Sequence, residues 1–136
     1  MSRRPGREDS LRHLEVRSAR SAVHGEWPTW ADADLVAALR QRGIDRPYAH
    51  QVGAAEAAYA GQHAVLATGT ASGKSLGYLL PALTRIADAR GERGQRGSTT
   101  LYLSPTKALA QDQLTSVSSL GVPGLRIATH DGDSSR

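Results

Sequence analysis

One stretch decides the fold: Leu66-Ala67-Thr68-Gly69-Thr70-Ala71-Ser72-Gly73-Lys74-Ser75. The mainly apolar residues 63–67 before the turn predict a buried parallel strand, and an apolar run that suits a helix starts at Ser75. Small residues between a strand and a helix let backbone N–H groups converge on an anion, which the positive end of the helix dipole also attracts. We therefore predict a loop that binds the phosphates of a nucleotide.

The two residues at the end of this loop have the chemistry of a phosphate site. The Lys74 ammonium would reach the β- and γ-phosphates, and the Ser75 hydroxyl would ligate the Mg²⁺ ion that bridges them. The strict pattern G-x-x-x-x-G-K-[ST] is not met, because Thr68 takes the first glycine position and the glycine follows at Gly69. An ordinary glycine-containing turn is the alternative. We assign catalysis to Lys74 and Ser75, the metal to Ser75, and ATP binding to Thr68, Gly69, Thr70, Ala71, Ser72, Gly73, Lys74 and Ser75.

Lysine usage supports the same interpretation. Of the 17 basic residues, only Lys74 and Lys107 are lysines, and the others are arginines. A compact ammonium and a planar guanidinium are not interchangeable where a point charge must fit among phosphate oxygens. Both lysines stand in motif-like segments, although chance could also place two lysines there.

Composition limits the classes of protein to consider. Of the 136 residues, 39% are hydrophobic, enough for one domain with a core, and cysteine is absent, which excludes disulfides, thiolate metal sites and cysteine nucleophiles. No apolar run approaches the roughly 20 residues of a membrane span, so we expect no membrane contact and a cytoplasmic protein. The net charge of +4 favours a polyanionic partner. Residues 1–25 are rich in arginine and read as a flexible tail rather than a nucleic-acid arm.

The order of elements predicts an α/β domain over residues 26–136. Helices are expected from an Asp32 or Asp34 cap to Gly43, from Pro47 to Gly61, from Ser75 to about Asp88, and from Thr106 to about Ser119. Strands are expected at 63–67, 99–103 and 126–129. Strands that alternate with helices predict a parallel sheet with right-handed crossovers.

Three motifs then fall in a fixed order. They are Arg46-Pro47-Tyr48-Ala49-His50-Gln51, the phosphate loop, and Leu103-Ser104-Pro105-Thr106-Lys107-Ala108-Leu109-Ala110-Gln111-Asp112-Gln113. Together they resemble the first motor domain of superfamily 2 helicases of the DEAD/DEAH-box type. The ending His130-Asp131-Gly132-Asp133-Ser134 resembles a segment of the subgroup related to large helicase-related and mitomycin-repair helicases, although a plain turn or a metal loop is also open.

The resemblance implies a RecA-like, parallel-sheet phosphate-loop domain and gives roles to the motif residues. Gln51 would read adenine, since an amide can accept from N6 and donate to N7, and Tyr48 or Arg46 would stack nearby. The nucleic-acid contacts fall on Pro105, Thr106, Lys107 and Gln111, where a helix N-terminus faces a backbone phosphate. The alternatives without a binding role are a solvent-exposed Gln51 and a capped amphipathic helix with Leu109 and Leu114 facing inward.

The resemblance also implies parts that this sequence lacks. It contains no Walker-B acidic motif, and the arginine fingers of the family come from a second motor domain. We expect the ATP-binding portion of an ATP-dependent helicase that binds ATP, Mg²⁺ and a nucleic-acid strand, DNA ahead of RNA, with DNA repair as its setting. Alone the chain should hydrolyse ATP poorly or not at all. A noncatalytic nucleic-acid-binding fragment and another phosphate-loop protein, such as a nucleotide kinase, are the alternatives.

Overall fold

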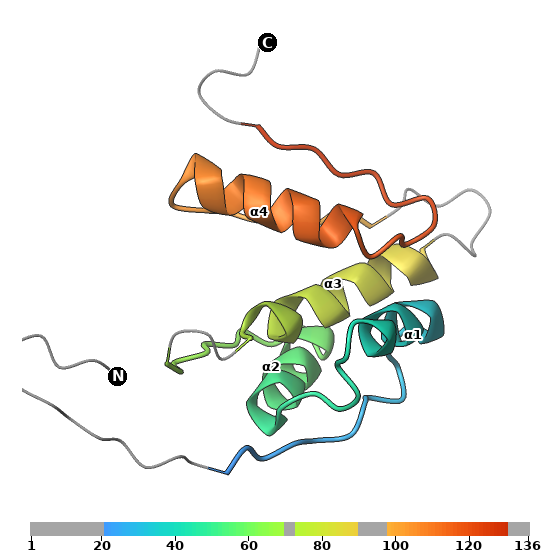
Figure 1. Ribbon diagram of the computed structural model, residues 1–136, viewed down its shortest axis with the longest axis vertical. Coiled ribbons are helices and arrows are strands. Elements are labelled where there is room, and N and C mark those ends of the chain that lie inside the picture. The colour runs from blue at the N-terminus through green and yellow to red at the C-terminus, as the bar shows by residue number, and fades with distance from the viewer. Residues whose placement is uncertain (1–20, 70–72, 90–97, 131–136) are drawn as a thin grey trace, which may run out of the picture.

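The computed structural model describes residues 21–69, 73–89 and 98–130. Within these ranges the chain forms four helices: α1 (Ala33–Gln41), α2 (Ala49–Tyr59), α3 (Ser75–Asp88) and α4 (Lys107–Ser118). Figure 1 shows α1 and α2 against one side of α3, with α4 across its other side. All four predicted helices are confirmed, each within about two residues of its expected bounds. Most of the predicted flexible tail, three loop residues (Thr70, Ala71, Ser72) and the ending Asp131-Gly132-Asp133-Ser134 lie outside the described residues.

The start of α1 is fixed by Asp32. Its side chain accepts a hydrogen bond of 2.8 Å from the Leu35 N–H, which satisfies one of the free donors of the first turn. The Asp32 N–H in turn donates to the Thr84 hydroxyl at 3.1 Å, and Thr84 on α3 is fully buried. The cap of one helix is thus tied to the middle of another, which holds α1 against α3.

α3 is the helix around which the others pack. It continues through Pro81, and Gly77 on its first turns lets α2 approach closely. A Cβ built at Gly77 would lie 2.8 Å from Leu66 Cδ1 and 3.3 Å from Ala54 Cβ, so any larger side chain would push these neighbours away. Close packing of α2 and α3 therefore depends on the absence of a side chain at this position.

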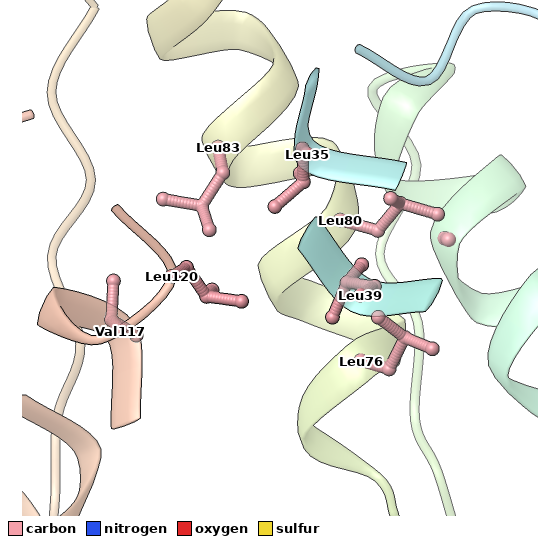
Figure 2. Packing of buried hydrophobic residues seen from close by; sticks show 8 residues of the cluster. Leu35, Leu39, Leu76, Leu80, Leu83, Val117 and Leu120 are labelled. Atoms are coloured by element: carbon pink, nitrogen blue, oxygen red, sulfur yellow. The ribbon is translucent and has the colours of Figure 1, made fainter. Parts of the chain in front are cut away.

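The hydrophobic core lies between the helices. Leu76, Leu80 and Leu83 of α3 face α1 and the end of α4 (Figure 2), and the remaining members are Leu35, Leu39, Ala55, Val117 and Leu120. Trp27 and Trp30 pack against this cluster, and the Trp30 ring stacks on Tyr59 with ring centres 3.9 Å apart. The core is therefore built mainly by helices, with α3 at its centre.

The predicted parallel sheet does not form within the described residues. They contain no β-strand, and their single β-bridge joins His24 to Tyr48. The expected strands 63–67, 99–103 and 126–129 have no regular secondary structure, and Val65 is 92% exposed while Leu101 and Leu103 are each 81% exposed. A strand leaves its backbone groups unpaired until a neighbour supplies partners, and a lone extended segment gains no burial to offset its ordering. These segments keep their apolar pattern without a sheet to pack into.

Candidate nucleotide and nucleic-acid site

The Lys74 side chain hydrogen-bonds to residues at the start of its own phosphate loop. It immediately precedes α3, and its ammonium donates to the Gly69 carbonyl at 2.7 Å and to the Thr68 carbonyl at 3.0 Å. The Thr68 hydroxyl lies 3.4 Å from the same nitrogen. The positive charge is therefore held over the turn that leads into the N-terminus of α3, where phosphate would gain from both the ammonium and the helix dipole.

Gly73 joins the loop to the rest of the fold. Its φ of +67° is in the left-handed region that disfavours other residues, and its carbonyl accepts from Leu76 N–H at 3.2 Å and from Gln51 Nε2 at 2.7 Å. A Cβ at this position would lie 2.6 Å from Gln51 Nε2. Both the backbone conformation and the close approach of Gln51 require glycine here.

Gln51 is a buried link between α2 and the phosphate loop. Only 5% of the residue is exposed, and its Oε1 accepts from the Tyr48 N–H at 2.8 Å while Nε2 donates to Gly73. These two contacts fix the orientation of the amide, since the oxygen faces a donor and the nitrogen faces an acceptor. The alternative of a solvated glutamine is wrong. Its role in reading adenine stays a prediction.

Aromatic rings gather beside the N-terminus of α2. The Tyr48 ring lies 4.9 Å from the His24 ring and 5.6 Å from the His50 ring. Backbone bonds hold this arrangement, because Ala49 N–H donates to the Val23 carbonyl and Gly25 N–H donates to the Pro47 carbonyl. Arg46, the other predicted stacking residue, forms an ion pair with Glu26 instead. Tyr48 therefore presents the aromatic surface next to Gln51.

Ser75 and Tyr78 lie one turn apart on α3. Ser75 is exposed, and the Tyr78 hydroxyl donates to Gln113 Oε1 of α4 at 3.2 Å. Burial is the main cause that raises the pKa of Tyr78 above its usual value of 10.0, and the nearby Tyr102 raises it further. At neutral pH the phenol therefore keeps its proton and acts as a hydrogen-bond donor.

The predicted nucleic-acid residues surround the start of α4. Thr106 caps the helix, accepting from the Leu109 N–H at 3.3 Å, and Lys107 opens the first turn with its side chain exposed. Pro105 and Gln111 are exposed as well. The alternative with Leu109 inward is wrong, because Leu109 is 50% exposed and α4 reaches the core through Val117 near its other end.

The structure thus brings one set of predicted residues together and leaves another on its own helix. Thr68, Gly69, Gly73, Lys74 and Gln51 form one connected group, which Ser75 continues into α3. The residues Pro105, Thr106, Lys107 and Gln111 belong to α4 and the turn before it. Sequence reasoning missed the contact of Gln51 with Gly73 and the bond between Tyr78 and Gln113.

Two further features were searched for in the described residues. No group of three or more His, Asp or Glu side chains there could hold a metal ion. No helix in this part of the chain is long and apolar enough to cross a membrane.

Known proteins place these motifs in a family. The model of the DEAD/DEAH box helicase family matches residues 48–136, and the chain belongs to this family. The range includes Tyr48, Gln51, the phosphate loop and α4. Family membership implies a RecA-like phosphate-loop fold, and the predicted resemblance to DEAD/DEAH-box helicases is confirmed.

Individual relatives show which helicases of the family the chain resembles. The chain is 39% identical over 134 residues to the uncharacterized ATP-dependent helicase YprA of Bacillus subtilis, covering 96% of this chain and 17% of that protein. It is 32% identical over 126 residues to the ATP-dependent helicase hrq1 of Schizosaccharomyces pombe, covering 88% of this chain and 11% of the relative. The predicted kinship with the mitomycin-repair subgroup is confirmed. The chain spans under a fifth of the length of these relatives.

A solved structure shows the same local arrangement. The DUF1998 helicase MrfA bound to DNA and AMPPNP superimposes with a TM-score of 0.72 at 42% sequence identity, covering 85% of this chain and 16% of that one. A second structure, of MrfA bound to DNA, gives a TM-score of 0.71. The described helices therefore have the arrangement of the matching part of a helicase.

Proposed function

We propose that this chain is the ATP-binding part of an ATP-dependent helicase and binds ATP-Mg²⁺ and one nucleic-acid strand, DNA in preference to RNA. The observation that carries this function is the bond from Gln51 Nε2 to the Gly73 carbonyl, which joins the predicted base-reading residue to the predicted phosphate loop. Family membership and the DNA- and AMPPNP-bound structure of MrfA support it. Hydrolysis and strand movement would belong to the whole helicase, with a second motor domain.

Gln51 retains the capacity to read adenine. An amide oxygen has two lone pairs and an amide nitrogen has two N–H groups, and Tyr48 and Gly73 each use one of them. The second lone pair would accept from adenine N6 and the second N–H would donate to N7. Guanine has a carbonyl oxygen in place of the N6 amine, so it would face Gln51 Oε1 with two acceptors and no proton.

The phosphates and the metal would occupy the loop end of the same site. Lys74 would exchange its bonds to the Thr68 and Gly69 carbonyls for phosphate oxygens, which are stronger charged acceptors. Thr70, Ala71, Ser72 and Gly73 would present backbone N–H groups to the same oxygens. The exposed Ser75 hydroxyl fits Mg²⁺, which usually takes one or two protein ligands and completes its shell with phosphates and water. Bound Mg²⁺ would neutralise charge on the phosphates.

The nucleic-acid strand would bind at the start of α4. Thr106 and Lys107 stand at a helix N-terminus, where backbone N–H groups and an exposed ammonium suit a phosphate. Pro105 and Gln111 flank this position. Such contacts depend on the nucleic-acid backbone and little on base sequence.

The proposal also includes the parallel sheet predicted from residues 63–67, 99–103 and 126–129, within the domain bounds 26–136. It further includes a cytoplasmic location and a role in DNA repair.

Substitution of Gln51 tests the nucleotide site. In Gln51→Glu the carboxylate keeps the acceptor for Tyr48 N–H but loses the donor to Gly73 and to adenine N7. An unpaired buried polar group costs about 1–3 kcal/mol, so we expect binding of a fluorescent ATP analogue with Mg²⁺ to weaken by about 5-fold to 100-fold. The measurement is fluorescence anisotropy, with a GTP analogue in parallel.

Nucleotide preference separates this function from simple anion binding. The wild-type chain should bind the ATP analogue more tightly than the GTP analogue, and Gln51→Glu should lose that preference. The matched control is Gln62→Glu, which makes the same change at an exposed position outside the site. Equal affinity of the wild-type chain for both analogues would contradict the assignment of Gln51 to adenine.

Substitution of Lys107 tests the nucleic-acid site. In Lys107→Ala one exposed positive charge is removed from the first turn of α4. Each phosphate contact to a single strand contributes about 0.7 to the slope of log affinity against log salt, so that slope should fall by about 0.7. Titration of a single-stranded oligonucleotide at several salt concentrations measures it. Arg40→Ala, which removes one charge from α1, should leave the slope nearly unchanged; equal losses would indicate a general charge effect.

A further inference from the structure

The C-terminal end of α4 is tied to α1 by Arg42. This residue directly follows α1, and its Nη2 donates to the Ser119 hydroxyl at 2.8 Å while its Nη1 donates to the Ser116 carbonyl at 3.4 Å. The Ser119 hydroxyl in turn donates to the same carbonyl at 2.8 Å. The guanidinium, the hydroxyl and the carbonyl therefore form a closed set of hydrogen bonds between residues that lie 74 and 77 positions apart in the sequence.

These bonds complete the end of α4. The last four carbonyl groups of a helix have no partner within it. Backbone N–H groups that follow the helix donate to three of these carbonyls, those of Thr115, Val117 and Ser118. The fourth, of Ser116, accepts from the side chains of Arg42 and Ser119. The guanidinium also faces the negative end of the helix dipole, where a positive charge is favourable. Arg42 therefore caps α4 from another helix.

α4 is packed at its C-terminal end and exposed at its first turn. Val117 and, just after the helix, Leu120 are buried in the core (Figure 2). The Tyr78 hydroxyl holds the middle of the helix through Gln113. Lys107 at the other end is exposed. The turn that would meet the nucleic-acid strand therefore takes its position from contacts made further along the helix.

We propose that Arg42 is a positioning residue of the nucleic-acid site, because it sets the direction of α4 and with it the place of the first turn. A helix rises about 1.5 Å per residue, so Lys107 lies about 14 Å along α4 from Ser116. A tilt of about 10° at the anchored end would move the first turn by about 2 Å. Such a shift is enough to break a hydrogen bond to a phosphate. This inference rests on the proposed nucleic-acid site and adds a residue that holds it in place.

Salt dependence distinguishes positioning from direct contact. Each phosphate contact to a single strand contributes about 0.7 to the slope of log affinity against log salt. If Arg42 acts through the first turn of α4, Arg42→Ala loses the same contact that Lys107→Ala loses. In the 136-residue chain each variant should then lower the slope by up to about 0.7, and the double variant should lower it by about 0.7 in total. Distant substitutions usually have additive effects, so a shared loss points to positioning.

Ser119→Ala gives a second test that changes no charge. It removes the hydroxyl that accepts from Arg42 Nη2 and donates to the Ser116 carbonyl. The slope should fall in the same direction as for Arg42→Ala, because the first turn of α4 has moved, and this variant decides the matter if Arg42→Ala fails to fold. The matched control is Ser118→Ala at the neighbouring exposed position, which should keep the wild-type slope. Binding of AMPPNP with Mg²⁺ should stay near the wild-type value in all of these variants, which general damage to the fold would not allow.

The outcomes separate this inference from the proposed function. A wild-type slope in both Arg42→Ala and Ser119→Ala, with a lower slope in Lys107→Ala, overturns the positioning role and leaves the nucleic-acid site intact. A fall of about 1.4 in the double variant means that Arg42 itself contacts a phosphate, which also overturns the positioning role. A wild-type slope in Lys107→Ala overturns the proposed nucleic-acid site, and the role of Arg42 falls with it.

Discussion

Lys74→Ala should weaken binding of a fluorescent ATP analogue with Mg²⁺ by about 10-fold to 100-fold. The ammonium would be the main charged donor to the β- and γ-phosphates, and a hydrogen bond to a charged group contributes about 1.5–3 kcal/mol. In the free protein the same ammonium bonds to the Thr68 and Gly69 carbonyls, so its removal also leaves the loop less ordered before nucleotide arrives. Both effects lower affinity, and anisotropy measured with and without Mg²⁺ reports their sum.

The second lysine supplies the matched control for this variant. Lys107→Ala removes the same side chain from α4, so it should keep nucleotide binding near the wild-type value and lose oligonucleotide affinity instead. Lys74→Ala should retain most of the salt-dependent oligonucleotide binding. Lys74→Arg should not restore nucleotide binding, because a planar fork does not replace a point charge in a close-fitting loop. Equal nucleotide affinity in the wild-type chain and Lys74→Ala would exclude a working phosphate loop.

The helices were predictable because their signals are local. Asp32 stands immediately before an apolar-periodic run and does cap α1, and Thr106 does the same for α4. The two residues act within three positions of themselves, so no knowledge of distant partners is needed.

The predicted sheet is absent from the described residues, and its pairing was harder to predict because a strand depends on neighbours that are far away in the sequence. The apolar pattern of 99–103 suits a strand, yet Leu101 and Leu103 are mostly exposed in this structure. A central strand needs a neighbouring strand at hydrogen-bond distance on each side. An alternating or continuous apolar pattern does not identify which segments of the chain are those neighbours. The sequence pattern therefore identifies segments that are apolar enough to be buried, but it does not identify the strands with which they would pair.

The site was partly predictable for the same reason. The loop from Thr68 to Ser75 is contiguous, so its chemistry can be read directly from the sequence. The bond from Gln51 to Gly73 joins residues 22 positions apart, and Tyr78 bonds to Gln113 across 35 positions. Neither contact has a sequence signature, because each depends on how α2 and α4 pack on α3. These two contacts were therefore visible only in the folded structure.

α3 carries the site at its first turn and the core along its length, so core substitutions should change stability without changing site chemistry. Leu80→Ala should lower the free energy of unfolding by about 2–5 kcal/mol, since Leu80 is 1% exposed among Leu35, Leu39 and Leu83, and its loss leaves a cavity. Urea denaturation followed by tryptophan fluorescence measures the change. Saturating AMPPNP with Mg²⁺ should raise the urea midpoint of this variant as it does for the wild type, because the ligand binds only the folded state.

Val65→Ala is the matched control, since it shortens an apolar side chain that is 92% exposed. In the structure described here this change should cost less than about 0.5 kcal/mol, as surface substitutions usually do. A cost above about 1 kcal/mol would mean that residues 63–67 are buried in solution, as a strand of the predicted sheet would be. A Leu80→Ala cost no larger than that of Val65→Ala would contradict the helical core. The pair of variants therefore tests at once where the core lies and whether the chain builds the sheet that its apolar pattern predicts.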